Sequence, residues 1–128
     1  LKYDSNQYHP TGSEVYRDYS GLYRFTHNYV DLGHILSDLP LKLENITLSS
    51  KNLNILDFHP VHIFTNTPSL NFYDKIKKFI PVGEELKKNI NTSEIGIRDL
   101  FIDILKFISK NKVRTTTLYQ YLKENKNL

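Results

Sequence analysis

The clearest pattern in the chain is an amphipathic repeat near its C-terminal end, which predicts a helix over residues 97–111. Its apolar positions recur at the three- and four-residue spacing of one helix face, and charged residues cover the other face. Gly96, immediately before this segment, allows a sharp turn or a close backbone approach. The repeat consists of Ile97, Leu100, Phe101, Ile104, Leu105 and Ile108. We expect Leu100, Phe101, Ile104 and Ile108 to face a sheet rather than solvent.

Other stretches have the composition of β-strands. Aromatic residues and a His fall on every second position through Leu22–Val30, which predicts a strand. In Asn54–Thr67, apolar, β-branched and aromatic residues predict a buried strand over Leu53–Phe58. Pro60 has no amide hydrogen to donate and should end the pairing of that strand. A β-branched run at Val113–Thr116 is a further strand candidate.

Three segments lack a clear period. Residues 1–21 are polar and rich in turn-forming residues, which predicts a loop. Residues 84–93 are highly charged, which predicts a mobile loop. Residues 41–50 carry a mixed pattern that fits either a half-buried strand or a turn of helix.

Residues typical of helix N-caps mark two more helices. Ser69 predicts a helix over Leu70–Phe79, and Thr117 predicts one over Leu118–Asn125. The alternation of strands and helices along the chain favours an α/β fold with parallel strands. Because the helical share is high, an all-α or winged-helix fold remains an alternative.

Titratable side chains gather where the two main strands are expected to end. Asp57, His59 and His62 follow one strand, and Asp31 and His34 follow the other. Ligands of α/β folds bind at the carboxyl ends of strands, and imidazole changes charge near neutral pH, which suits acid–base catalysis. Two His are too few for a closed metal site, which needs about four ligands. A His near an apolar strand is more often a hydrogen-bonded structural residue, so both interpretations stay open.

Composition limits the class of function. At 128 residues the chain fits one domain, and the absence of Cys excludes disulfides and thiol chemistry. No apolar run reaches the ~18 residues of a membrane span, and we expect a cytoplasmic protein. The net charge is +3, but the Lys residues form no dense stripe, so we do not expect nucleic acid as a partner. The chain contains no Met and begins with Leu1, which predicts that it is a piece of a longer protein.

Four stretches resemble, in the same order, segments of polysaccharide deacetylases of the NodB type, and most closely a divergent branch of surface-polysaccharide synthesis. The first, Leu1–Asn6, is similar to a Tyr-Asp-Ser-Ser element, and Tyr29–His34 is similar to a Trp-Glu-Asp-Asp-x-His element. Asp57–Thr67 reads Asp-Phe-His-Pro-Val-His-Ile-Phe-Thr-Asn-Thr and resembles a late-strand segment. Gly96–Leu122 is similar to the last helix, strand and helix of that family.

The resemblance implies that residues 1–128 are the C-terminal portion of an incomplete (β/α) barrel with parallel strands. It implies a hydrolase that removes N-acyl or O-acyl groups from a carbohydrate substrate with a divalent metal, usually zinc. The Asp and His ligands of that metal would lie upstream, so no metal ligand is expected in this chain. The late-strand His, which acts as the catalytic acid, would be His59, with Asp31 favoured over Asp57 as its carboxylate partner. The expected substrate contacts are Asp31, His34, His62 and Asn66.

The chain departs from the family's pattern at one element. Tyr29, Val30 and Leu32 stand where the family has Trp, Glu and the second Asp. A catalytically silent carbohydrate-binding or assembly domain on the same fold is therefore an alternative function. A small basic nucleic-acid-binding module is a further alternative, and it would be recognised by salt-dependent binding. The oligomeric state is open.

Overall fold

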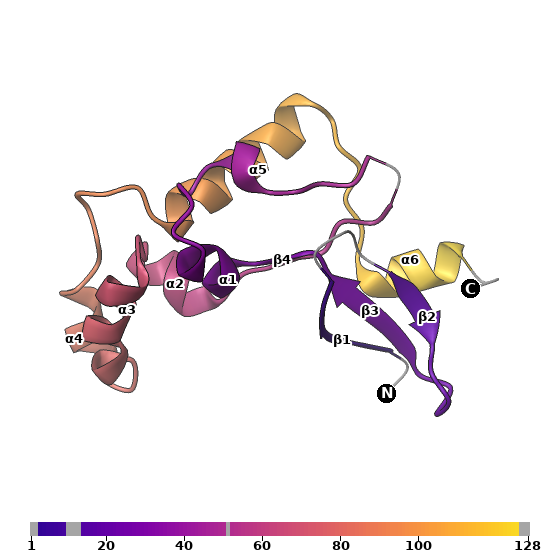
Figure 1. Cartoon of the computed structure of the whole chain (residues 1–128), viewed down its shortest axis with the longest axis horizontal. Coiled ribbons are helices and arrows are strands. Elements are labelled where there is room, and N and C mark those ends of the chain that lie inside the picture. The colour runs from indigo at the N-terminus through magenta and orange to yellow at the C-terminus, as the bar shows by residue number, and fades with distance from the viewer. Residues whose placement is uncertain (1–2, 10–13, 51, 126–128) are drawn as a thin grey trace.

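Two small sheets and a set of short helices make up the structure, a computed structural model that describes residues 3–9, 14–50 and 52–125. The strands are β1 (Tyr3–Tyr8), β2 (Val15–Arg17), β3 (Tyr23–His27), β4 (Tyr29–Val30) and β5 (Leu56–Asp57). The helices are α1 (Asp31–Leu36), α2 (Pro60–Thr65), α3 (Leu70–Ile76), α4 (Gly83–Lys87), α5 (Ile97–Lys110) and α6 (Leu118–Glu124), with 3-10 turns η1 (Leu43–Asn45) and η2 (Lys77–Phe79). Figure 1 shows the larger sheet with α6 at one end of the molecule and α3 and α4 at the other.

The larger sheet has β3 at its centre, with β1 parallel to it on one side and β2 antiparallel on the other. The prediction of a loop over residues 1–21 is therefore wrong for β1 and β2; residues 1–2 and 10–13 lie outside the described residues. The polar side chains that suggested a loop include partners for Arg24 of β3, which forms ion pairs with Asp4 and with Asp18, the latter at 2.8 Å. Pairing with a distant strand outweighs the local preference for turns.

The chain passes from β3 to β4 at Asn28, whose side chain replaces ladder hydrogen bonds. Asn28 Oδ1 accepts from the amide of Ile55 at 2.8 Å, and its Nδ2 donates to the carbonyl of Thr47 at 3.0 Å. The strand predicted over Leu22–Val30 is confirmed, with this break in it. β4 then pairs in parallel with β5, with Tyr29 opposite Leu56. The parallel strand pairs confirm an α/β fold and overturn the all-α alternative.

The strand predicted over Leu53–Phe58 is present only as β5, two residues long. It ends before Pro60 as predicted, but α2, which begins at Pro60, was not anticipated. Proline suits the first position of a helix because its missing amide hydrogen would have no intrahelical partner there. This helix carries His62 into the interior, where only 2% of its surface is exposed.

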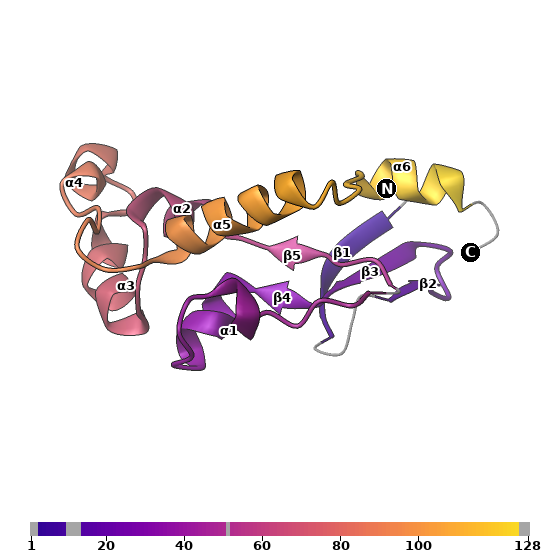
Figure 2. The same cartoon turned by 90° about the horizontal axis from the view of Figure 1, so that it is seen from above.

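The core lies where α5 packs on the smaller sheet. Tyr29, Ile46, Leu100 and Ile104 form the buried cluster, against which Leu41, Leu43, Leu56, Phe58 and Ile108 pack. The helix predicted over residues 97–111 is confirmed by α5, and Figure 2 shows it running alongside β5. Leu105 belongs to the same apolar repeat but lies at its edge, with 49% of its surface exposed.

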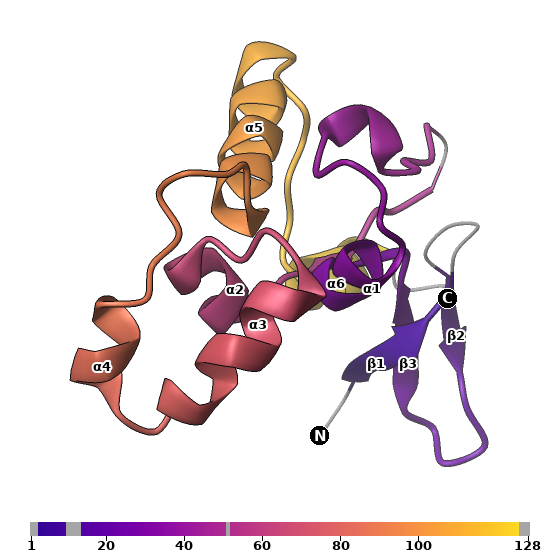
Figure 3. The same cartoon turned by 60° about the vertical axis from the view of Figure 1, so that its left-hand side comes forward.

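The predicted N-caps are both confirmed. Ser69 Oγ accepts from the amide of Phe72 at 3.3 Å and begins α3, and Thr117 Oγ1 accepts from the amide of Gln120 at 3.1 Å and begins α6. Residues 41–50 contain the turn of helix rather than the strand, as η1. The Val113–Thr116 strand is not formed. Instead this exposed segment leads from α5 to α6 (Figure 3). There Tyr121 packs against Phe25 of the larger sheet, with ring centroids 6.1 Å apart.

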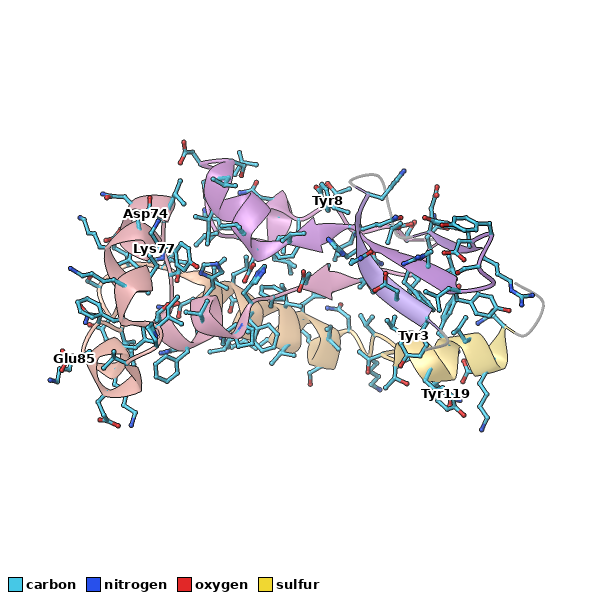
Figure 4. The ribbon with its side chains drawn as sticks, turned by 90° about the horizontal axis from the view of Figure 1, so that it is seen from below. Tyr3, Tyr8, Asp74, Lys77, Glu85 and Tyr119 are labelled. Atoms are coloured by element: carbon cyan, nitrogen blue, oxygen red, sulfur yellow. The ribbon has the colours of Figure 1, made fainter. Side chains whose placement is uncertain are left out.

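The mobile loop predicted over residues 84–93 was wrong for its first four residues, which belong to α4, whereas residues 88–93 lie in no helix or strand. The charges of this segment form pairs along the helix, Lys87 with Glu84 at 2.7 Å and Lys88 with Glu85 at 2.6 Å. Asp74 and Lys77 form a similar surface pair on the neighbouring α3 and η2, at the end of the molecule opposite Tyr3 and Tyr119 (Figure 4). The longest described helix, α5, has 14 residues, and none of the described helices could cross a bilayer.

Candidate active site

The parallel strands β4 and β5 end side by side and bring Asp31 and His59 together. Asp31 is the first residue of α1, and His59 is the N-cap residue of α2. His59 Nδ1 lies 2.5 Å from Asp31 Oδ1, and the His59 amide donates to Asp31 Oδ2 at 2.7 Å. Asp31 is fully buried, whereas the side chain of His59 is 45% exposed. Asp31, rather than Asp57, is therefore the carboxylate that contacts His59.

The hydrogen bonds of Asp31 fix the orientation of the His59 ring and the nitrogen that carries its hydrogen. Asp31 Oδ1 also accepts from the amide of Leu32 at 2.7 Å, so both carboxylate oxygens are held by donors. A carboxylate only accepts, so the hydrogen in the His59–Asp31 bond belongs to His59 Nδ1. The second ring nitrogen, Nε2, is left for a ligand or substrate.

His62 lies one turn further along α2, between two other rings. Its ring centroid is 5.5 Å from that of His59 and 4.7 Å from that of Tyr73 on α3, both edge to face. Its Nδ1 lies 3.1 Å from Thr67 Oγ1. Burial lowers the pKa of His62; the charge of Asp31 opposes this shift and His59 adds to it. The neutral ring is the form that this environment favours.

Asp31, His59 and His62 also form a group that could hold a metal ion, with one ligand atom of each within 4.8 Å of the others. The sequence predicted no metal ligand in this chain, and that grouping makes these three residues candidates for one. Asp31 Oδ1 and His59 Nδ1 are hydrogen-bonded at 2.5 Å. Two ligands of a tetrahedral zinc lie about 3.3 Å apart, so these two atoms do not fit one ion together. Both Nδ1 atoms are hydrogen-bonded, so the Nε2 atoms of the two His are the ring nitrogens left for an ion, and further ligands would have to come from elsewhere.

His34 does not join the group and packs against Tyr29 instead. Its Nε2 donates to the carbonyl of Pro40 at 3.0 Å, so its Nδ1 accepts from Tyr29 Oη at 3.2 Å. Burial raises the pKa of Tyr29, and the charge of Asp31 adds to the shift. His34 lines a separate cavity of about 540 Å³ with Tyr8 and Leu39. The ring of His34 is thus hydrogen-bonded to Tyr29 and Pro40 rather than to Asp31 or His59.

Asn66 is buried and is turned toward the start of α5. It has a left-handed backbone with φ of 52°, and its Nδ2 donates to Asp99 Oδ2 at 2.9 Å. Its Oδ1 accepts from the amide of Arg98 at 3.1 Å. With both ends of its amide engaged, Asn66 connects α2 to α5, and this geometry gives no support to the predicted substrate contact.

Several residues around the site were missed by sequence reasoning. Thr65 and Thr67 are both fully buried beside His62, and Arg98 Nε donates to the carbonyl of Ile63 near the end of α2, at 2.9 Å. The signal for Thr65 was its position four residues after Val61, because such a Thr can donate back into its own helix. Arg98 gave no local signal, because its partner lies 35 residues away.

Comparison with protein families supplies an independent observation. Residues 1–77 match the model of the WbmS-like polysaccharide deacetylases. The chain belongs to this family. The resemblance drawn from its motifs is thereby confirmed. Comparison with curated proteins found no match.

A solved structure agrees with this membership. The chain is similar to a candidate polysaccharide deacetylase involved in O-antigen biosynthesis from Bordetella bronchiseptica, with 25% sequence identity and a TM-score of 0.72. The match covers 84% of this chain and 46% of that chain. The chain thus spans about half the length of the solved relative.

Proposed function

We propose that this chain is the C-terminal part of a deacetylase that removes an N- or O-linked acyl group from a sugar during surface-polysaccharide synthesis. Membership of the family supports the reaction class, and the O-antigen role of the solved relative supports the substrate class. The observation that carries the proposal is the buried Asp31 carboxylate bound to the half-exposed His59 ring. The complete protein would form the incomplete (β/α) barrel of the family.

His59 is the proton donor in this proposal. Hydrolysis adds water to the acyl carbon and breaks the bond from that carbon to the sugar nitrogen or oxygen. The leaving atom must gain a proton, because an amine or alkoxide is a poor leaving group without one. In its imidazolium form His59 pairs with Asp31 through Nδ1 and donates from Nε2 to the leaving atom. The Asp31 bonds to the ring and to the His59 amide hold the ring in this orientation.

A divalent metal, zinc in the first instance, would polarise the acyl oxygen and supply the activated water. His59 and His62 are the residues of this chain that could contact such an ion, and the remaining ligands would come from upstream residues. Metal binding and proton donation would both use His59 Nε2, so His59 cannot do both at once. We favour the acid role because this chain supplies too few further ligands for a metal at His59, while the 2.5 Å bond to Asp31 holds the ring with Nε2 free.

The test measures acyl release by the full-length protein from an N-acetylglucosamine oligosaccharide and from an O-acetylated sugar. His59→Ala should lower the rate ~10²–10⁴-fold, the usual effect of removing a positioned acid. His9→Asn is the control, because it replaces a His that directly follows β1, outside the site, and should leave the rate unchanged. An unchanged rate for His59→Ala would remove the catalytic assignment.

A catalytically silent carbohydrate-binding domain is the second candidate. It is favoured by Tyr29, Val30 and Leu32, which replace residues of the family's Trp-Glu-Asp-Asp-x-His element. This candidate predicts that the full-length protein binds the acylated oligosaccharide but releases no acyl group, with or without added zinc. Release of acetate in stoichiometric excess over protein would exclude it.

A further inference from the structure

A chain of hydroxyl groups leads from the backbone of α2 to the ring of His62. Thr65 Oγ1 lies 2.7 Å from the carbonyl oxygen of Val61 and 2.8 Å from Thr67 Oγ1. Thr67 Oγ1 in turn lies 3.1 Å from His62 Nδ1. Thr65 and Thr67 are fully buried, so no water competes for these bonds.

The direction of every bond in this chain follows from counting hydrogens. A carbonyl only accepts, so Thr65 uses its single hydroxyl hydrogen on Val61. Thr65 must then accept from Thr67, which uses the single hydrogen of Thr67. With that hydrogen spent, Thr67 can only accept from His62, so the hydrogen between them belongs to His62 Nδ1. The neutral form that burial favours is therefore protonated at Nδ1 and bare at Nε2.

His62 Nε2 is the atom through which this buried residue can accept. It makes no hydrogen bond among the described residues, where the His62 ring is hydrogen-bonded through Nδ1 alone. No fully buried nitrogen or oxygen of a described, non-exposed side chain is left without a partner. The edge of the ring at Nε2 must therefore be the part that reaches solvent, through the 2% of His62 that is exposed.

We infer that Thr65 and Thr67 are positioning residues that fix His62 as an acceptor at Nε2, where it binds a hydroxyl or amide hydrogen of the sugar. The choice of the sugar as the group that binds His62 Nε2 rests on the proposed function, but the tautomer of His62 does not. His59 and His62, with ring centroids 5.5 Å apart, then have opposite roles. His59 donates from Nε2 to the leaving atom, and His62 accepts at Nε2 from a neighbouring group of the same sugar.

The tautomer is tested by nitrogen NMR of the full-length protein labelled with ¹⁵N-histidine, at a pH where His62 is neutral. The wild type should show the His62 hydrogen on Nδ1. A hydrogen on Nε2 would overturn the inference without any variant. The measurement does not depend on activity, so it separates this inference from the proposed function.

Substitutions at Thr65 test the hydroxyl chain itself. Thr65→Val keeps the shape of the side chain but removes the acceptor for Thr67, whose hydrogen then turns to His62 Nδ1. The His62 hydrogen should move to Nε2 in this variant. Thr65→Ser, the matched control, keeps the hydroxyl and should keep the wild-type tautomer. An unchanged tautomer in folded Thr65→Val would show that the hydroxyl groups of Thr65 and Thr67 do not control the tautomer of His62.

Steady-state kinetics then test whether the sugar is the group that binds at His62 Nε2. Loss of one hydrogen bond to the sugar should raise KM roughly 2- to 12-fold in Thr65→Val, with little change in kcat and none in Thr65→Ser. If the tautomer moves but KM does not, the sugar is the wrong occupant. A change in the wild-type His62 Nε2 signal on adding zinc would show that a metal binds this nitrogen instead. That result would equally overturn the assignment of the sugar.

Discussion

His59 Nδ1 and Asp31 Oδ1 lie 2.5 Å apart although 28 residues separate them in the sequence. The contact exists because β4 and β5 are parallel, so that the residues after Val30 and Asp57 emerge at one edge. Asp31 holds the His59 ring and the His59 backbone with its two oxygens. This pair links the fold to the proposed chemistry, and its two members can be tested separately.

Asp31→Asn should weaken acyl release in the full-length protein. An amide offers one acceptor where the carboxylate offers two, so a donor of the amide must face the His59 amide, Leu32 or the His59 ring. We expect a rate loss of the same order as for a missing acid, ~10²–10⁴-fold, and a loss of about 1–3 kcal/mol in unfolding free energy. Asp57→Asn is the control: Asp57 is exposed, and we expect no change in either quantity. Equal rates for the two variants would refute the pairing.

Gly96→Ala should disturb the joint between α2 and α5. A Cβ at Gly96 would lie 2.1 Å from the carbonyl oxygen of Asn66, so one of the two backbones must move. We expect a loss of about 1–3 kcal/mol in unfolding free energy, the usual cost of overpacking, measured by urea unfolding. Gly83→Ala provides the control, because a Cβ there meets nothing within 4 Å. A Gly96→Ala variant as stable as Gly83→Ala would argue against the close approach.

Leu100→Ala tests the packing of α5 on the smaller sheet. Leu100 is 1% exposed in the core cluster, so the substitution should leave a cavity and cost about 2–5 kcal/mol. Leu105→Ala removes the same side chain from a position that is 49% exposed, and should change stability by less than about 0.5 kcal/mol. Thermal or urea unfolding of both variants gives the comparison. Similar losses for the two would mean that α5 is docked by a different face.

Asp99 should make stability depend on acidity. The Gly96 amide, and then the Asn66 side chain, hold the pKa of Asp99 below its usual value of about 3.9. Its stabilising effect is therefore complete above the unfolded value and is lost as the pH falls through the lower, folded value. The advantage of the wild type over Asp99→Asn should shrink across that acidic range in urea unfolding. Asp103→Asn removes an exposed carboxylate of the same helix, and should have little effect at any pH.

Zinc should bind this chain only weakly. Two His nitrogens are short of the three or four protein ligands of a stable site, and Asp31 already accepts from His59 and Leu32. Titration calorimetry on the purified chain should give a dissociation constant in the micromolar range or weaker, weakened further by His62→Ala. His34→Ala should leave it unchanged, since both ring nitrogens of His34 are engaged by Tyr29 and Pro40. Tight stoichiometric binding would promote Asp31, His59 and His62 to a metal centre.

Features that depend on neighbouring residues could be predicted from the sequence. The caps at Ser69 and Thr117 and the helix over residues 97–111 are set by contacts within a few residues, and the structure has all three. The motif over Asp57–Thr67 identified the family and selected His59. The two caps and the helix follow from local hydrogen bonding and from the helical period.

Tertiary structure alone decided which of the candidate groups meet. The sequence placed His34 and Asn66 with His59, but the fold directs His34 to Tyr29 and Asn66 to Asp99. Likewise β1 is polar by itself and becomes a strand only because β3 supplies its ladder. The direction of a side chain depends on the register of its strand and on partners tens of residues away. Those long-range contacts, rather than local preference, assembled Asp31, His59 and His62.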